Sequence, residues 1–139
     1  WKLCDILSGL PQIYAETVEE CIPQHVNMDL VNGISFSKGC YPGQEIIARL
    51  KYLGKSKYRL CAATAEAPKP VFPGEPLFTA EQPRQKAGVV IDAVATGKGR
   101  CCLSAMLKID RGEHPPAHLG SADGPGLTLG SLPYSVPVE

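Results

Sequence analysis

The spacing of apolar residues divides the chain near residue 55. Before that point apolar residues recur at helical spacing, over residues 1–10 and again over residues 46–53. Beyond it, short β-branched and apolar runs alternate with turns that contain glycine or proline, which is typical of strands. The pattern therefore predicts helices and loops first and a sheet afterwards, with a boundary within residues 52–57.

Glycine and proline mark the ends of the expected helices. Gly9 is expected to end the first helix, and residues 42–43 to open the second, which Gly54 ends. Residues 17–20 have the Thr-x-x-Glu form of a capping box, which predicts a short helical turn. Residues 33–36 alternate between apolar and polar and predict an extended segment.

The second half of the chain predicts a small antiparallel barrel or sandwich. A tight hairpin is expected at residues 96–99, between two of the strands. Many short strands at regular spacing favour such a barrel, so the fold class is α+β, mainly β. The division is residues 1–54 followed by a barrel over residues 55–139. The expected strands are 58–64, 75–79, 87–94, 101–107 and 127–129.

Composition excludes several classes of protein. With 44% hydrophobic and 20% charged residues among 139, the chain can bury a core and is not a disordered tail. A net charge of zero gives no whole-chain attraction to nucleic acid or to an anionic membrane, and no apolar run approaches a membrane helix. Because the chain opens at Trp1 without a charged-then-apolar leader, we expect a piece of a longer polypeptide.

The neutral total conceals two segments of opposite charge. Residues 1–37 are mainly acidic, whereas residues 38–59 are mainly basic. The basic segment is either a solvated helix face or an anion site for the glutamate tail of a folate or for RNA phosphates. Few aromatic residues interleave with it, so base stacking has little support.

The six cysteines are expected to be reduced thiols of a cytoplasmic protein. No Cys-x-x-Cys occurs, and the adjacent pair Cys101 and Cys102 would face opposite sides of a strand. The histidines at positions 25, 114 and 118 lie near no such pair, so we expect no metal site.

The strongest local signal is the segment KGCYPGQE at residues 38–45. Two glycines bracket Cys40 just before the second helix, where Lys38 and the helix N-terminus would favour a thiolate. Gln44 and Glu45 lie in the first turn and can face the same space, and Glu45 is spaced to pair with Arg49. A tight turn with a buried cysteine remains the structural alternative.

This segment and its flanks resemble the YgfZ family, folate-binding relatives of the aminomethyltransferase of glycine cleavage. The similarity extends over residues 46–55, upstream over residues 23–36 and downstream over residues 74–94. It implies that residues 1–54 end a folate-binding α+β domain and that a barrel follows. It also implies tetrahydrofolate as cofactor, with Cys40 as a reactive thiol. The implied folate contacts are Lys38, Gly39, Tyr41, Gly43, Gln44, Glu45 and Arg49.

The resemblance implies a folate-dependent accessory protein for iron–sulfur protein assembly or repair and for tRNA modification. Iron–sulfur proteins or their assembly factors would be partners, and whether the protein catalyses a one-carbon transfer stays open. Two alternatives remain. One is the aminomethyltransferase itself, against which Cys40 argues because the matching loop of that enzyme lacks Lys-Gly-Cys. The other is a non-catalytic β-barrel interaction module.

Overall fold

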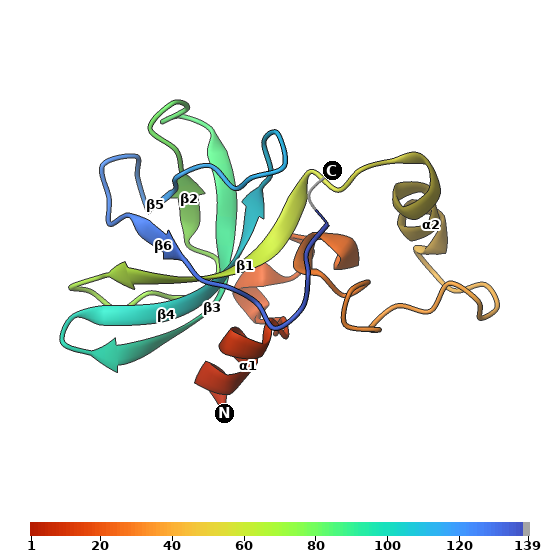
Figure 1. The fold of residues 1–139 in the computed structure, drawn as a ribbon, viewed down its shortest axis with the longest axis horizontal. Helices are drawn as coiled ribbons and strands as arrows, with labels where there is room; N and C mark the ends of the chain where they lie inside the picture. The colour runs from red at the N-terminus through yellow and green to blue at the C-terminus, as the bar shows by residue number, and fades with distance from the viewer. Residues whose placement is uncertain (138–139) are drawn as a thin grey trace.

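Six antiparallel strands form one curled sheet in the computed structural model, which describes residues 1–137 (Figure 1). Their order across the sheet is β5-β2-β3-β4-β1-β6. The edges approach each other, because Leu119 N–H donates to Pro125 O and Leu127 N–H to Ala117 O, both at 2.9 Å. The sheet is thus barrel-like. The strands are β1 (Tyr58–Glu66), β2 (Pro76–Phe78), β3 (Lys86–Gly97), β4 (Arg100–Lys108), β5 (His118–Leu119) and β6 (Leu127–Leu129).

The predicted strands are confirmed in position, with small differences in length. The β3–β4 hairpin closes through Lys98 and Gly99 alone, whose φ angles of 53° and 68° suit the tight turn that matches strand twist. The sequence missed β5, because two residues give no periodicity. Residues 138–139 of the expected barrel lie outside the described residues. The α+β domain expected to precede the barrel remains a prediction.

Two α-helices and two 3-10 helices precede the sheet: α1 (Lys2–Ser8), η1 (Ala15–Thr17), η2 (Pro23–Val26) and α2 (Gln44–Leu53). Both predicted α-helices are confirmed, and Gly9 ends α1 with a φ of 66°. The capping box at residues 17–20 is wrong. Thr17 closes η1 instead of opening a helix, and its Oγ1 accepts the Tyr14 N–H at 3.0 Å. Residues 33–36 are a bend and not a strand.

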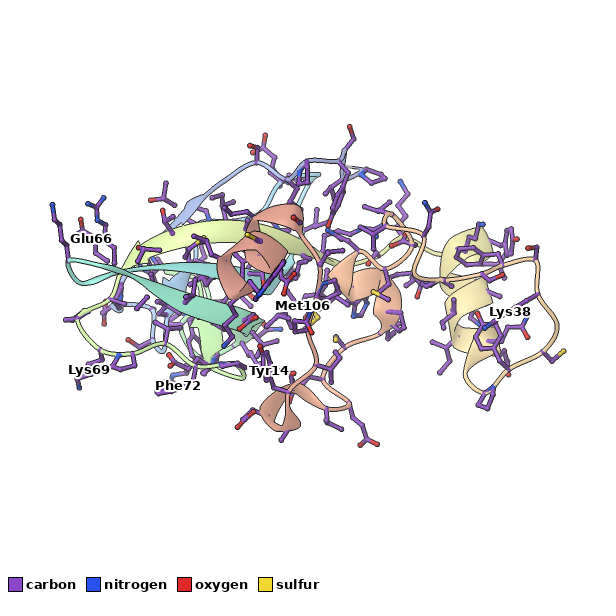
Figure 2. All side chains as sticks on the ribbon, turned by 90° about the horizontal axis from the view of Figure 1, so that it is seen from below. Tyr14, Lys38, Glu66, Lys69, Phe72 and Met106 are labelled. Carbon is purple, nitrogen blue, oxygen red and sulfur yellow. The ribbon has the colours of Figure 1, made fainter. Side chains whose placement is uncertain are left out.

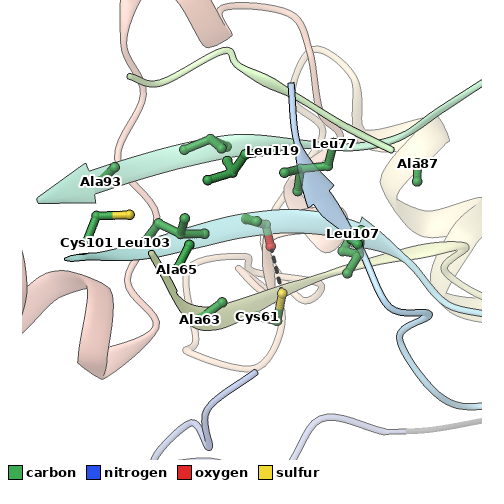
Figure 3. Close-up of a cluster of buried hydrophobic side chains, with 13 residues drawn as sticks. Cys61, Ala63, Ala65, Leu77, Ala87, Ala93, Cys101, Leu103, Leu107 and Leu119 are labelled. Carbon is green, nitrogen blue, oxygen red and sulfur yellow. Dashed lines mark hydrogen bonds between the residues drawn. The ribbon is translucent and has the colours of Figure 1, made fainter. Parts of the chain in front are cut away.

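The sheet is buried on both faces. Inside the curl lies one cluster, which includes Leu77, Leu103 and Leu107, with the Cys61 thiol donating to Ala105 O at 3.5 Å (Figure 3). Cys101 belongs to this cluster, while Cys102 is also buried. Since side chains alternate along a strand, the two thiols face opposite sides, as predicted. The outer face carries a second cluster, which comprises Val26, Leu60, Val89, Ile91 and Met106.

Residues 1–31 cover that outer face through polar as well as apolar contacts. Asp92 on β3 is 1% exposed; it accepts a hydrogen bond from the Tyr14 hydroxyl at 3.0 Å and pairs with Lys2 Nζ at 3.0 Å. The Asn27 side chain donates to Leu60 O at 2.9 Å and accepts from Leu60 N at 3.2 Å. β6 pairs with residues 63–65 of β1 and does not reach Leu60. The Asn27 side chain therefore satisfies the backbone N–H and C=O groups of Leu60 on the same edge of the strand.

The segment between the cover, residues 1–31, and the sheet differs from both in burial. We call residues 32–57 the motif arm. It contains the motif and α2, and none of its residues is buried. Figure 1 shows α2 standing off from the sheet. The fold thus places the motif on a projecting arm beside a well-packed sheet.

Candidate functional site

The motif forms an exposed loop that leads into α2. Gly43 is the N-cap of α2 with a φ of 80°, a left-handed conformation that favours glycine. Gly39 and Cys40 are exposed and precede the helix by several residues. The thiol is therefore accessible and lies just before the helix, where the sequence placed it. The alternative of a buried cysteine in this turn is wrong.

Hydrogen bonds and an aromatic contact order the loop around Tyr41. The Tyr41 N–H donates to Gln44 Oε1 at 3.3 Å, and the Tyr41 hydroxyl donates to Ser35 O at 3.4 Å. Lys38 Nζ lies 4.7 Å from the centre of the Tyr41 ring, and Figure 2 shows Lys38 beside α2. Lys38 thus makes a cation–π contact, and Gln44 supports the loop backbone.

The predicted pair on the first turns of α2 is confirmed. Arg49 Nη2 lies 2.9 Å from Glu45 Oε1, and both side chains are mostly exposed. Such a pair contributes about 0.3–0.5 kcal/mol to an exposed helix. Glu45 and Arg49 therefore engage each other on the solvent side of α2.

The six thiols fall into three groups by exposure, of which the intermediate one is Cys21, whose pKa is raised by burial. Cys4 and Cys40 are exposed, whereas Cys61, Cys101 and Cys102 are buried in the sheet. Burial raises the pKa of Cys61 to about 12 and also raises the pKa values of Cys101 and Cys102. Because the thiolate is the nucleophile, the sheet cysteines are chemically quiet and Cys40 is the accessible thiol of the motif.

A mostly apolar cavity of about 310 Å³, which we call the motif pocket, lies between the arm and the cover segment. Two of the implied folate contacts, Lys38 and Tyr41, line it. Gly39, Cys40, Gly43, Gln44, Glu45 and Arg49 are not among its lining residues. Sequence reasoning missed the apolar walls, because these residues are scattered along the chain with no common motif: Ile13, Val26, Met28, Ile34 and Ile47.

The motif pocket has the size and the lining of a small-molecule site. Small-molecule sites are mostly apolar with a few polar groups, and begin at about 300 Å³. One aromatic ring system matches the apolar walls, and the Lys38 ammonium matches a carboxylate. Among residues 1–137, no cluster of three or more His, Cys, Asp and Glu side chains is arranged to hold a metal ion. No helix of the described chain is long and apolar enough to cross a membrane.

Comparison with known proteins confirms the resemblance to the YgfZ family. No protein-family model matches the sequence. The chain is 34% identical over 141 aligned residues to the tRNA-modifying protein YgfZ of Colwellia psychrerythraea. The alignment covers 100% of this chain and 43% of that protein. The YgfZ of Photobacterium profundum is 36% identical over 98% of this chain and 42% of its own length. That of Hamiltonella defensa is 40% identical over 79% of this chain and 33% of its own length. The chain thus spans less than half the length of these relatives.

Proposed function

This chain matches the YgfZ family along almost its whole length, and from this we propose that it is the C-terminal portion of a YgfZ-type accessory protein in tRNA modification. The relatives carry the words "tRNA-modifying" in their names. The observation that carries the proposal is the pairing of that similarity with an exposed motif loop. The loop presents Cys40 to solvent directly beside a ligand-sized pocket.

In this proposal tetrahydrofolate is the cofactor, and the motif pocket holds one of its ring systems. Lys38 and Tyr41 line the pocket, and Lys38 supplies a positive charge for a folate carboxylate. Cys40 lies outside the lining, so its role is separate from folate binding. We assign it the accessory function towards iron–sulfur proteins and tRNA-modifying enzymes in the cytoplasm.

Folate titration of the complete polypeptide that carries this chain tests the pocket. Ile47 lines the motif pocket, whereas its neighbour Ile46 is 59% exposed and lines neither this pocket nor the sheet. Ile47→Trp fills the pocket and is expected to weaken tetrahydrofolate binding at least about tenfold. Ile46→Trp is the matched control and should bind as the parent does. Equal affinities in both variants would contradict the assignment of the pocket.

A second experiment tests the motif cysteine. In a bacterium lacking its own YgfZ, we expect the complete protein to restore modified nucleosides in tRNA, measured by mass spectrometry. Cys40→Ala should fail to restore them while binding folate normally, and Cys4→Ala, at the other exposed thiol, should restore them. Absence of folate binding together with full restoration by Cys40→Ala would favour the interaction module. Transfer of an aminomethyl group to folate would favour the aminomethyltransferase.

A further inference from the structure

A second cavity, which we call the Arg59 cavity, shares no lining residue with the motif pocket. Its volume is about 270 Å³. Residues from η2, the motif arm and the start of β1 converge on it. Its polar and aromatic walls include Gln24, Asp29, Phe36, Lys51, Lys55 and Arg59.

Arg59 is a fixed cation in the wall of this cavity. The residue is only 9% exposed. Its Nη1 lies 2.8 and 3.0 Å from the two Asp29 carboxylate oxygens and donates to Gln24 O at 3.0 Å. Every side-chain hydrogen bond that Arg59 makes to residues 1–137 uses Nη1. The guanidinium is therefore held in place while the N–H groups of Nε and Nη2 remain available to an anion.

Two lysines add charge to the same cavity. Lys51 Nζ lies 3.5 Å from the centre of the Phe36 ring, a cation–π contact that holds the ammonium against the wall. Lys55 follows just beyond the end of α2. The ion pairs of the described chain involve Lys2, Arg49, Arg59 and Lys86, but neither of these lysines. With Asp29 as the one carboxylate among the described lining residues, these residues carry two positive charges in excess.

The cavity also holds an acceptor without a donor. Gln24 is 3% exposed; its Nε2 donates to Ile47 O at 2.6 Å, but its Oε1 accepts no hydrogen bond from the described residues. The bond to Ile47 holds the Gln24 side chain in the wall of the cavity.

We propose that the Arg59 cavity binds the terminal phosphate and sugar of a nucleotide, either free or at the 5′ end of an RNA. A guanidinium fork matches phosphate oxygens, and a phosphate monoester carries a charge of about −1.5 to −2 at neutral pH, which balances the excess. A single carboxylate would balance only half of it. Leu50 and Ile109 supply apolar walls for the sugar. The RNA source rests on the proposed role in tRNA modification, whereas the phosphate chemistry does not.

Calorimetric titration of the 139-residue chain tests the site with four probes. AMP and a 5′-phosphorylated RNA oligonucleotide are compared with adenosine and the same oligonucleotide bearing a 5′-hydroxyl. We expect each phosphorylated probe to bind at least about tenfold more tightly than its partner, with an advantage that shrinks as salt rises. Adenosine binding as tightly as AMP would overturn the proposal. AMP binding without preference for the phosphorylated RNA would support the phosphate site and assign it to a free nucleotide.

Single substitutions of lysine and arginine test whether AMP binds in the Arg59 cavity. Lys51→Gln and Lys55→Gln should each weaken AMP binding several-fold, while Lys57→Gln, at an exposed lysine outside the lining, should leave it unchanged. An equal loss in all three would indicate diffuse attraction and overturn the proposal. Arg59→Lys keeps a charge beside Asp29 but removes the fork, so it should weaken binding in a folded protein, as checked by circular dichroism. Folate titration reads the motif pocket, so AMP binding without folate binding would contradict the proposed function alone.

Discussion

The sheet and the motif arm are opposites in how deeply their residues are buried. Strands β3 and β4 are buried on both faces by the interior cluster and by the cover of residues 1–31, whereas no residue of the motif arm is buried. The arm contributes the exposed thiol of Cys40 and one wall of each of the two cavities described above. Stability therefore resides in the sheet and its cover, while the arm presents the groups available for chemistry.

Thiol chemistry should separate the two regions most strongly. At pH 8 a thiol with a pKa of about 12, as for Cys61, is ionised in only about one molecule in ten thousand. We expect Cys61 to react with iodoacetamide at least about a thousandfold more slowly than Cys40, with the exposed Cys4 as internal reference. Peptide mapping by mass spectrometry over time measures the rates. Comparable labelling of Cys61 in folded protein would break the comparison.

Truncation of a leucine should be costly in the sheet and nearly free in the arm. Leu103 is 0% exposed in the interior cluster, and Leu53 at the end of α2 is 85% exposed. We expect Leu103→Ala to lower the free energy of unfolding by about 2–5 kcal/mol and Leu53→Ala to change it by less than about 0.5 kcal/mol. Urea unfolding followed by circular dichroism measures both. A large loss in Leu53→Ala would show that the arm is part of the core.

A glycine-to-alanine substitution should be costly in the sheet and nearly free in the arm, because the room for an added methyl group differs between the two regions. A Cβ on Gly88 of β3 would collide with the Met106 carbonyl oxygen and lie 3.0 Å from Leu107 Cα, both backbone atoms of β4. A Cβ on Gly39 would meet nothing within 4 Å. Gly88→Ala should therefore cost about 1–3 kcal/mol or more, and Gly39→Ala less than about 0.5 kcal/mol. Thermal unfolding of the two variants side by side provides the test, and equal melting temperatures would refute it.

Acid should weaken the junction between cover and sheet. Burial, and then the nearby Arg59 charge, lower the pKa of His25, whose ring lies 5.2 Å from that of Tyr58. Burial also lowers the pKa of His114. Since the unfolded chain takes up these protons first, stability should fall as the pH drops below about 6.5 towards the lowered values. His25→Leu should make the free energy of unfolding, measured with urea, less dependent on pH between pH 7.5 and 5.5. An unchanged dependence on pH would show that His25 does not contribute to the loss of stability in acid.

Local signals in the sequence predicted most of the helices and strands correctly. Gly9, Gly43 and Gly54 marked the helix ends correctly, and the β-branched runs located β1, β3 and β4. The capping box failed because Thr17 bonds back to Tyr14, a competition that the local pattern does not reveal.

Long-range contacts could not be predicted. Asp92 lies on a strand that the sequence located, but its burial against Tyr14 and Lys2 depends on residues almost eighty or more positions away in the chain. The candidate site followed the same rule. The motif located the exposed loop and the Glu45–Arg49 pair, but Gln24, Asp29 and Arg59 meet only through the tertiary fold.

Hydrogen exchange of the 139-residue chain tests the division between sheet and arm most directly. Amides of β3 and β4 should exchange only through global unfolding, with rates that rise steeply with added denaturant. Amides of α2 should exchange at least about a hundredfold faster, through local openings that depend little on denaturant, because α2 has no buried residue. Equal protection and equal denaturant dependence in α2 and the central strands would contradict the account.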